Sequence, residues 1–107
     1  MDPKAPEFGR FTEPSLLILV TLSQGPKHGY AIMTDIETDT GRPMGAGTLY
    51  AALARLEESG LIEPLAPVDR RRPYRLTGVG ASMLAEQLRG LSAFAQQGLR
   101  QLGESMS

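Results

Sequence analysis

The sequence predicts a mainly α-helical protein that carries one small β-hairpin. Three observations predict this fold class. Apolar residues recur at helical spacing in four separate stretches. Two short segments with strand character lie between the third and fourth stretches, on either side of a loop. Glycine or proline stands at most breaks between these elements, and the length of 107 residues suits one domain.

The composition excludes several classes of function. With a net charge of −1, the chain does not have the excess of cations that a nonspecific polybasic binder needs. It has no cysteine, and its single histidine, His28, has no evident carboxylate partners at metal-ligand spacing. We therefore expect no metal, no cofactor and no enzymatic activity. No apolar run reaches the roughly 20 residues of a membrane span and no signal peptide is evident, which predicts a cytoplasmic protein.

The first predicted helix begins close to Pro14. Thr12 is suited to cap it, Glu13 to its positive end, and Pro14 to its first turn. The segment Leu16–Leu22 is apolar nearly all round, so this helix should be the most deeply buried. Residues 1–11 show no periodicity and are expected to form a flexible arm, either native or a remnant of cloning.

A second helix is predicted to open at Lys27-His28-Gly29-Tyr30 and to stop at Gly41. Ile32, Met33 and Ile36 recur at helical spacing and should face the core. The acids of this helix should face water, and they are Asp35, Glu37 and Asp39.

The third helix, from about Ala46 to Ser59, is the element around which the chain is organised. Leu49, Leu53 and Leu56 share one face, which should be buried. The leading end of the opposite face carries small residues, one hydroxyl and one aromatic ring, while its acids are confined to the last turn. A helix with such an uncharged end fits the major groove of DNA. A plain amphipathic helix in a small bundle is the alternative.

A hairpin is predicted directly after this helix. Leu61–Leu65 forms its first strand, in which Pro64 favours a sheet edge, and Tyr74–Leu76 forms its second. A hairpin that follows two helices joined by a brief turn gives a winged helix-turn-helix. The three consecutive arginines of the hairpin loop, Arg70–Arg72, would then lie beside a phosphate backbone; a solvated loop is the alternative.

Thr77 is predicted to cap a long final helix whose apolar residues form a heptad seam. The seam consists of Leu84, Leu88, Leu91, Ala95, Gly98 and Leu102, widened by Met83, Phe94 and Leu99. A domain of this size cannot cover so long an apolar face, so the seam predicts a dimerisation helix and a closed homodimer. Folding of the helix back onto its own core is the alternative. The chain thus divides into an arm (1–11), a winged helix-turn-helix (12–77) and a dimerisation helix with its tail (78–107).

Four short motifs occur in order along the chain. They are His28-Gly29-Tyr30, Gly47-Thr48-Leu49-Tyr50, Leu53-x-x-Leu56-Glu57-x-x-Gly60-Leu61-Ile62 and Tyr74-Arg75-Leu76-Thr77-x-x-Gly80. In this order and at these separations they resemble the PadR family of bacterial transcriptional regulators, over about residues 15–100. The single C-terminal helix is similar to the smaller subfamily. The resemblance implies a homodimer, formed mainly through the last helix, that binds a near-palindromic DNA operator.

The resemblance also implies a repressor that releases DNA when a small molecule binds. Family members often stack planar apolar compounds on tryptophan in the dimer cavity. This chain has no tryptophan. A small apolar effector is therefore left open, with no residue assigned to it.

We expect four residues of the third helix to lie at the DNA groove, with the Ala51 methyl suited to a thymine methyl. The expected DNA-binding residues are Gly47, Thr48, Tyr50 and Ala51 at the groove, Lys27, Tyr30 and Arg55 at phosphates, and Arg70, Arg71, Arg72 and Arg75 from the wing. Each of three residues has an alternative role. Tyr30 packs where the two helices cross, Arg55 pairs with Glu58, and Arg75 braces the wing strand. The alternative for the whole protein is a winged-helix module that binds another protein and not DNA.

Overall fold

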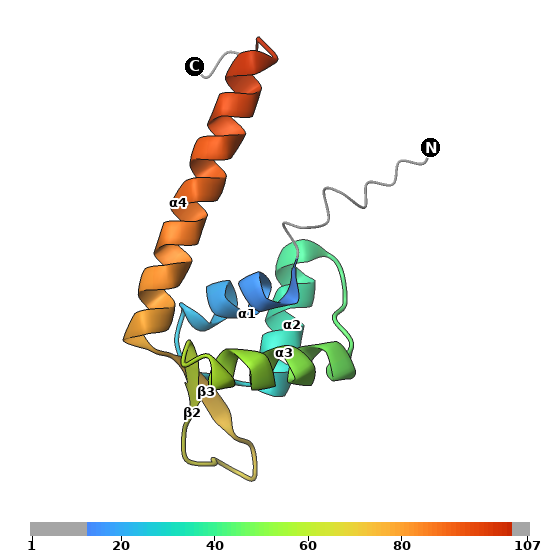
Figure 1. The fold of residues 1–107 in the computed structure, drawn as a ribbon. Coiled ribbons are helices and arrows are strands. Elements are labelled where there is room, and N and C mark those ends of the chain that lie inside the picture. The colour runs from blue at the N-terminus through green and yellow to red at the C-terminus, as the bar shows by residue number, and fades with distance from the viewer. Residues whose placement is uncertain (1–12, 104–107) are drawn as a thin grey trace.

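The structure, a computed structural model, describes residues 13–103 and consists of a helical head from which one long helix projects (Figure 1). The predicted arm and Thr12 lie outside the described residues. In chain order the elements are α1 (Pro14–Leu22), β1 (Lys27–His28), α2 (Gly29–Thr40), α3 (Ala46–Glu58), β2 (Ile62–Pro64), β3 (Pro73–Leu76) and α4 (Gly78–Gln101). The predicted fold class, mainly helical with a small sheet in a winged helix-turn-helix, is confirmed.

The helices begin and end where local signals predict. Gly41 ends α2 with a φ of 74°, and Gly60 follows α3 with a φ of 76°, a left-handed conformation that glycine adopts without cost. The Thr77 hydroxyl caps α4 by accepting a hydrogen bond from the Gly80 N–H at 3.0 Å. At α1 the N-cap residue is Glu13, whose side chain makes no capping bond.

The core lies where α1, α2, α3 and the first turns of α4 meet. The predicted apolar face of α3 is buried, and α1 buries four of its nine residues. The side chains that are almost completely removed from solvent are Ile18, Leu22, Ile32, Leu49, Leu53 and Ile62. Burial of each such side chain contributes about 1.5–3 kcal/mol, so this cluster dominates the stability of the head.

The sheet has three antiparallel strands in the order β1-β3-β2, and not the two strands that the sequence predicts. Lys27 and His28 pair with Tyr74 and Pro73 of β3, so α2 begins two residues later than expected. A two-residue strand is too short to show alternation, and it exists only through its pairing. Pro64 lies in β2 at a sheet edge, as predicted.

The long helix α4 is anchored to the head only at its start. Gly80 and Leu84 are its buried residues, and Leu84 belongs to the core of its own head. The prediction that Leu84 forms part of the exposed seam is therefore wrong. From Leu88 onward the large apolar side chains are exposed except for the half-buried Leu91, and the helix runs away from the head (Figure 1). The alternative of a folded-back helix is therefore wrong. Along residues 13–103, α4 included, no helix has the length and apolarity to cross a bilayer.

Candidate nucleic-acid interface

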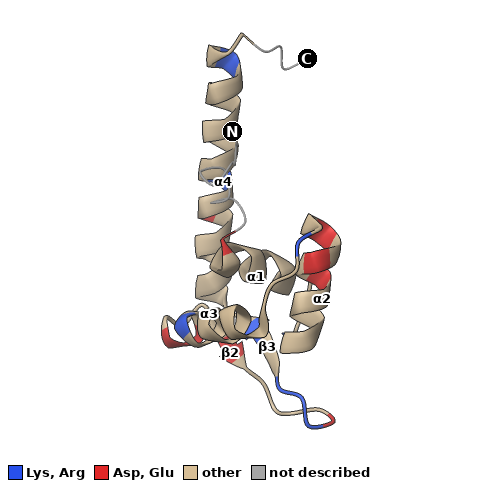
Figure 2. Ribbon diagram, turned by 90° about the vertical axis from the view of Figure 1, so that its right-hand side faces the viewer, with Lys and Arg blue, Asp and Glu red and all other residues tan. Residues whose placement is uncertain are grey.

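A cleft of about 300 Å³ opens between the start of α2, the exposed face of α3 and the wing, which comprises β2, β3 and the loop between them. We call it the wing cleft. Its lining residues are His28, Gly29, Tyr30, Tyr50, Arg70, Arg71, Arg72 and Tyr74. Three segments that are distant in sequence thus bring five of the predicted DNA-binding residues together. Figure 2 shows the basic residues of the wing loop at the end of the molecule opposite the projecting part of α4.

The exposed face of α3 forms one wall of this region. Gly47, Thr48 and Ala51 are exposed, and no acid lies in the first turn. Arg55 is also exposed, and the structure shows no ion pair between it and Glu58. The structure therefore presents the small, uncharged helix surface that the sequence predicts at this place.

Tyr50 lies directly over the first turn of α2. A Cβ atom added at Gly29 would lie 2.4 Å from the Tyr50 hydroxyl oxygen, so the end of this ring packs closely on the glycine. Tyr30, by contrast, is 64% exposed. The packing role at the helix crossing, considered above for Tyr30, therefore belongs to Tyr50, and two of the four sequence motifs meet at this contact.

The tip of the wing is a tight turn without glycine. Asp69 and Arg70 both have positive φ, 52° and 68°, and they join Val68 to Arg71. Val68 and Arg71 exchange two backbone hydrogen bonds of 2.7 and 2.9 Å, as in a two-residue hairpin turn in which both central residues are left-handed. Arg70 therefore lies at the tip, where it is exposed and borders the wing cleft.

The other two arginines of the loop are held by neighbouring groups. The Arg72 guanidinium donates a hydrogen bond of 2.9 Å to the Leu65 carbonyl, across the wing loop. The Arg71 guanidinium lies 3.2 Å from His28 Nε2 and 6.0 Å from the centre of the Tyr30 ring, within cation–π range. Arg71 therefore connects the wing to the start of α2.

His28 is a member of this site that sequence reasoning missed. Its Nδ1 accepts a hydrogen bond of 3.3 Å from the Ala31 N–H and so caps α2. The sequence places His28 at the opening of the second helix and in one of the four motifs, without a DNA contact. Among residues 13–103 no three His, Asp or Glu side chains gather in a way that could hold a metal. Its place directly before a helix was the signal that could have identified it as a cap.

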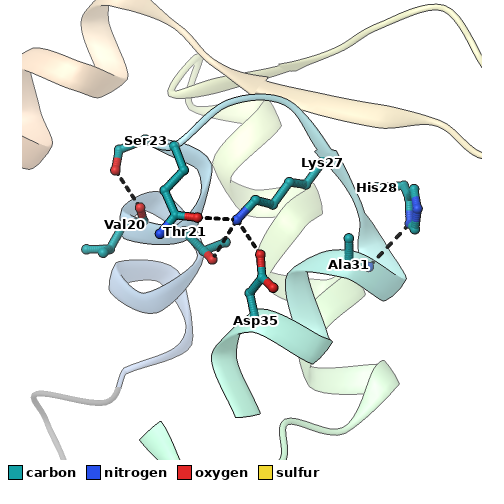
Figure 3. A network of polar contacts seen from close by, with 8 residues as sticks. Val20, Thr21, Ser23, Lys27, His28, Ala31 and Asp35 are labelled. Carbon is teal, nitrogen blue, oxygen red and sulfur yellow. Dashed lines mark hydrogen bonds and ion pairs between the residues drawn. The ribbon is translucent and has the colours of Figure 1, made fainter. Parts of the chain in front are cut away.

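Lys27 was expected to contact a phosphate, but its side chain does not line the wing cleft. Its ammonium forms an ion pair with Asp35 and hydrogen bonds of 2.7 Å to Gln24 and 3.4 Å to Thr21 (Figure 3). Its side chain is 15% exposed. Lys27 thus ties the end of α1 to α2 inside the head, and this corrects its assignment as a phosphate contact. Asp35, predicted to face water, is half-buried by the same contact.

Arg75 is engaged within the sheet. It lies opposite Glu63 in the antiparallel register of β2 and β3, and the two side chains form an ion pair. This pairing fits the alternative role, a brace for the wing strand, and the phosphate contact of the exposed Arg75 stays a prediction.

Tyr74 forms the floor of the wing cleft on the central strand. Burial raises the pKa of its phenol above the ordinary 10.0, and the nearby Glu57 and Tyr50 raise it further, while Arg72 opposes the shift. The hydroxyl therefore stays protonated at neutral pH and can donate a hydrogen bond.

Two comparisons place this chain beside known proteins. A model of the "Transcriptional regulator PadR-like family" matches residues 18–86. An "uncharacterized 37.1 kDa protein" of a Streptomyces fradiae transposon is 41% identical over 83 residues, which are 78% of this chain and 24% of that protein. The chain therefore spans about a quarter of that relative's length.

Solved structures share both the head and the long helix. A transcriptional regulator from Clostridium thermocellum is 26% identical with a TM-score of 0.76, over 90% of this chain and 95% of that one. A PadR family transcription regulator from hypervirulent Clostridium difficile is 26% identical with a TM-score of 0.69, over 83% of this chain and 96% of that one.

Proposed function

Because this chain belongs to the PadR-like family of transcriptional regulators, we propose that it is a homodimeric repressor that binds a near-palindromic DNA operator. In this proposal residues 12–77 bind DNA and residues 78–107 hold the second copy. The wing cleft is the observation that carries the proposal, because it combines a basic loop, exposed tyrosines and an uncharged helix face. The proteins of this family are regulators and not enzymes, in agreement with the expectation from the sequence.

The helix α3 would lie in the major groove. Thr48 and Ala51 present a hydroxyl and a methyl group at its exposed face, the two kinds of group that read base edges without a charge. Gly47 lets the backbone approach closely, because it has no side chain to hold it off. Tyr50 would contribute through the half of its surface that stays exposed, 52%. Substitution of Thr48 should therefore change the preference among operators more than the overall affinity.

Phosphate contacts would come from the two sides of α3. Arg70 and Arg71 lie on the wing side, and Tyr30 lies beside them at the start of α2. Arg55, further along α3, is exposed. Such contacts fix the position of a protein on the duplex and carry little sequence information. They would therefore supply affinity, while α3 would supply sequence specificity.

The second copy would cover the exposed seam of α4. Leu88, Phe94, Leu99 and Leu102 are 41%, 68%, 38% and 79% exposed, and water-facing apolar groups of this number on one helix favour a partner. Leu91, Ala95 and Gly98 lie on the same face and complete the predicted interface. A projecting helix of a few turns is also marginally stable alone in water. A two-fold dimer would place two α3 helices about one DNA turn apart, on the order of 34 Å.

An effector would need both copies. The apolar groove between α1, α2 and α4 measures about 230 Å³ and is lined by Leu16, Val20, Leu88 and Leu91 among others. Pockets for drug-sized ligands measure about 300–1,000 Å³, so this groove alone is small for one. We propose that a small apolar effector, where one acts, binds between the copies and favours one angle between the heads.

The test of DNA binding is the salt dependence of affinity in two matched double variants. Arg70→Ala with Arg71→Ala removes two charges from the wing cleft, and Arg89→Ala with Arg100→Ala removes two from α4. Each lost phosphate contact should lower the slope of log K against log salt by about 0.9, and the dimer loses each contact twice, so only the first variant should flatten it, by up to about 3.6. Fluorescence anisotropy with a labelled duplex measures both.

Two results would contradict the proposal. Equal slopes in the two double variants would show that the wing cleft holds no phosphate. Capture of a protein partner that is insensitive to salt, without any binding to duplex DNA, would instead favour the interaction module.

A further inference from the structure

The two ring nitrogens of His28 face groups that both donate hydrogen bonds. On one side the Ala31 N–H points at Nδ1 at 3.3 Å, as Figure 3 shows at the start of α2. On the other side the Arg71 guanidinium lies 3.2 Å from Nε2. A backbone N–H and a guanidinium are donors only, so each of them needs an acceptor.

A neutral imidazole cannot accept at both nitrogens. One nitrogen carries the proton and donates, and the other accepts. When Nδ1 caps α2, the proton is on Nε2, and the Nε2–H then faces the N–H groups of Arg71. Two donors meet at the mouth of the wing cleft with no acceptor between them.

In the opposite tautomer the two donors that face each other lie at the start of α2. With the proton on Nδ1, Nε2 accepts from Arg71, but the Ala31 N–H then faces another N–H and α2 loses its cap. The cap satisfies an amide that has no other partner within its helix, whereas a guanidinium at the surface finds water. The capping tautomer is therefore favoured, and it leaves the donor pair open to the cleft.

We propose that one phosphate of the DNA backbone is bound between His28 and Arg71, with an oxygen that accepts from the Nε2–H and from the guanidinium. This inference rests on the proposed function and adds a residue to it. Hydrogen bonds from a cation to a phosphate oxygen are short and strong, and the Tyr30 ring beside Arg71 keeps the guanidinium at the cleft. The phosphate belongs to DNA because the same cleft is bounded by Tyr50 of α3, the helix proposed to enter the groove.

The first experiment determines the tautomer by nitrogen-15 NMR. His28 is the single histidine of the sequence, so its ring resonances need no assignment. We expect the Nε2–H tautomer in the free protein and a shift of the Nε2 resonance when a duplex of random sequence is added. An Nδ1–H tautomer, or an Nε2 resonance that a saturating duplex leaves unmoved, would overturn the inference.

The second experiment separates the two nitrogens by substitution. In His28→Asn the amide oxygen takes the place of Nδ1 and can cap α2, but nothing replaces Nε2. We expect an unfolding temperature close to that of the natural protein and an affinity for the duplex at least about tenfold lower at constant salt, because a hydrogen bond to a charged group is lost. The salt slope should change little, because the neutral ring carries no charge and Arg71 remains. In His28→Gln the amide reaches the position of Nε2 and the cap is lost. Here we expect a lower unfolding temperature and an affinity for the duplex close to that of the natural protein.

The outcomes distinguish this inference from the proposed function. If the natural protein shows no salt-dependent binding to the duplex, the proposed function fails. If it binds and His28→Asn keeps the full affinity at constant salt, only the inference fails. Inorganic phosphate is the remaining control, and a shift of Nε2 with phosphate but none with the duplex would overturn the assignment to DNA.

Discussion

At the scale of single residues, Gly80 shows how closely α4 approaches the head. A Cβ atom at this position would lie 2.1 Å from the carbonyl oxygen of Leu61, a backbone atom that cannot swing aside. The same carbonyl accepts the Thr77 N–H at 3.1 Å, and the Thr77 hydroxyl donates to the Gly60 carbonyl at 2.7 Å. The start of α4 is thus locked to the turn after α3.

We predict that Gly80→Ala destabilises the protein by at least about 1–3 kcal/mol, the usual cost of overpacking. Urea unfolding measures the change. Gly90→Ala on the same helix is the matched control, because a Cβ there meets nothing within 4 Å. Alanine has the higher helix propensity, so this control should gain up to about 1 kcal/mol. A similar effect of both substitutions would mean that α4 is not docked as described.

Tyr74 makes stability depend on pH in the alkaline range. Its pKa is raised in the folded protein, so the folded state keeps the phenol proton where the unfolded state loses it, from about pH 10. The stabilisation is complete below that pH and is lost as the pH rises through the folded pKa. We predict that the unfolding temperature of Tyr74→Phe falls less steeply with pH above 10 than that of the natural protein. Thermal unfolding at a series of pH values measures this. Parallel curves for the two proteins would exclude burial of Tyr74 as the cause.

At the scale of elements, the wing turn combines strain with exposure. Asp69 and Arg70 are left-handed without being glycine, which costs roughly 1–2 kcal/mol for each residue. Strained residues of this kind are often found where a side chain must be presented for function. We therefore interpret Arg70 as a residue that lowers the stability of the turn but places a positive charge at its tip.

Arg70→Gly should accordingly raise stability by about 1 kcal/mol and lower the salt slope of DNA binding by about 1.8, one contact from each chain of the dimer. Arg70→Ala, which keeps the strained turn, should lower the slope equally without stabilising the protein. Thermal unfolding and anisotropy titrations on the same samples measure both effects. A gain in stability from both substitutions would show that the left-handed turn carries no strain.

Elements with local signals could be predicted from the sequence, and elements made by pairing could not. Gly41 and Thr77 mark helix ends by their own conformational and capping properties, and the leucines of α3 mark its buried face by spacing. The strand β1 has no such signal. Lys27 and His28 become a strand because β3 lies beside them, a contact across more than forty residues.

The same division holds for the candidate site. The third helix and the arginine run could be located from composition and order, and the fold brings Tyr30, Tyr50 and Arg71 into one cleft. The acidic partners of two basic residues could not be predicted. Lys27 and Arg75 are held by Asp35 and Glu63, and a lone charge in a sequence does not say which acid the fold will bring to it.

At the scale of the whole molecule, the structure has an anchored end and a free end. The core holds α4 through Gly80 and Leu84, and the apolar face beyond them leaves the head. The heptad spacing predicted one continuous seam from Leu84 to Leu102. Spacing alone cannot show where the head stops covering that seam, because this depends on how α1 packs against the first turns of α4.

If this free end is the dimer interface, a charge on it should separate the copies. We predict that Phe94→Glu, at a side chain 68% exposed in one chain, yields monomers by light scattering. Its unfolding temperature should no longer rise with protein concentration, as it does for a dimer. Ala93→Glu adds the same charge on the side of α4 that faces away from the heptad seam and should remain dimeric. Because neither side chain belongs to the core of the head, monomers in both variants or in neither would place the interface elsewhere.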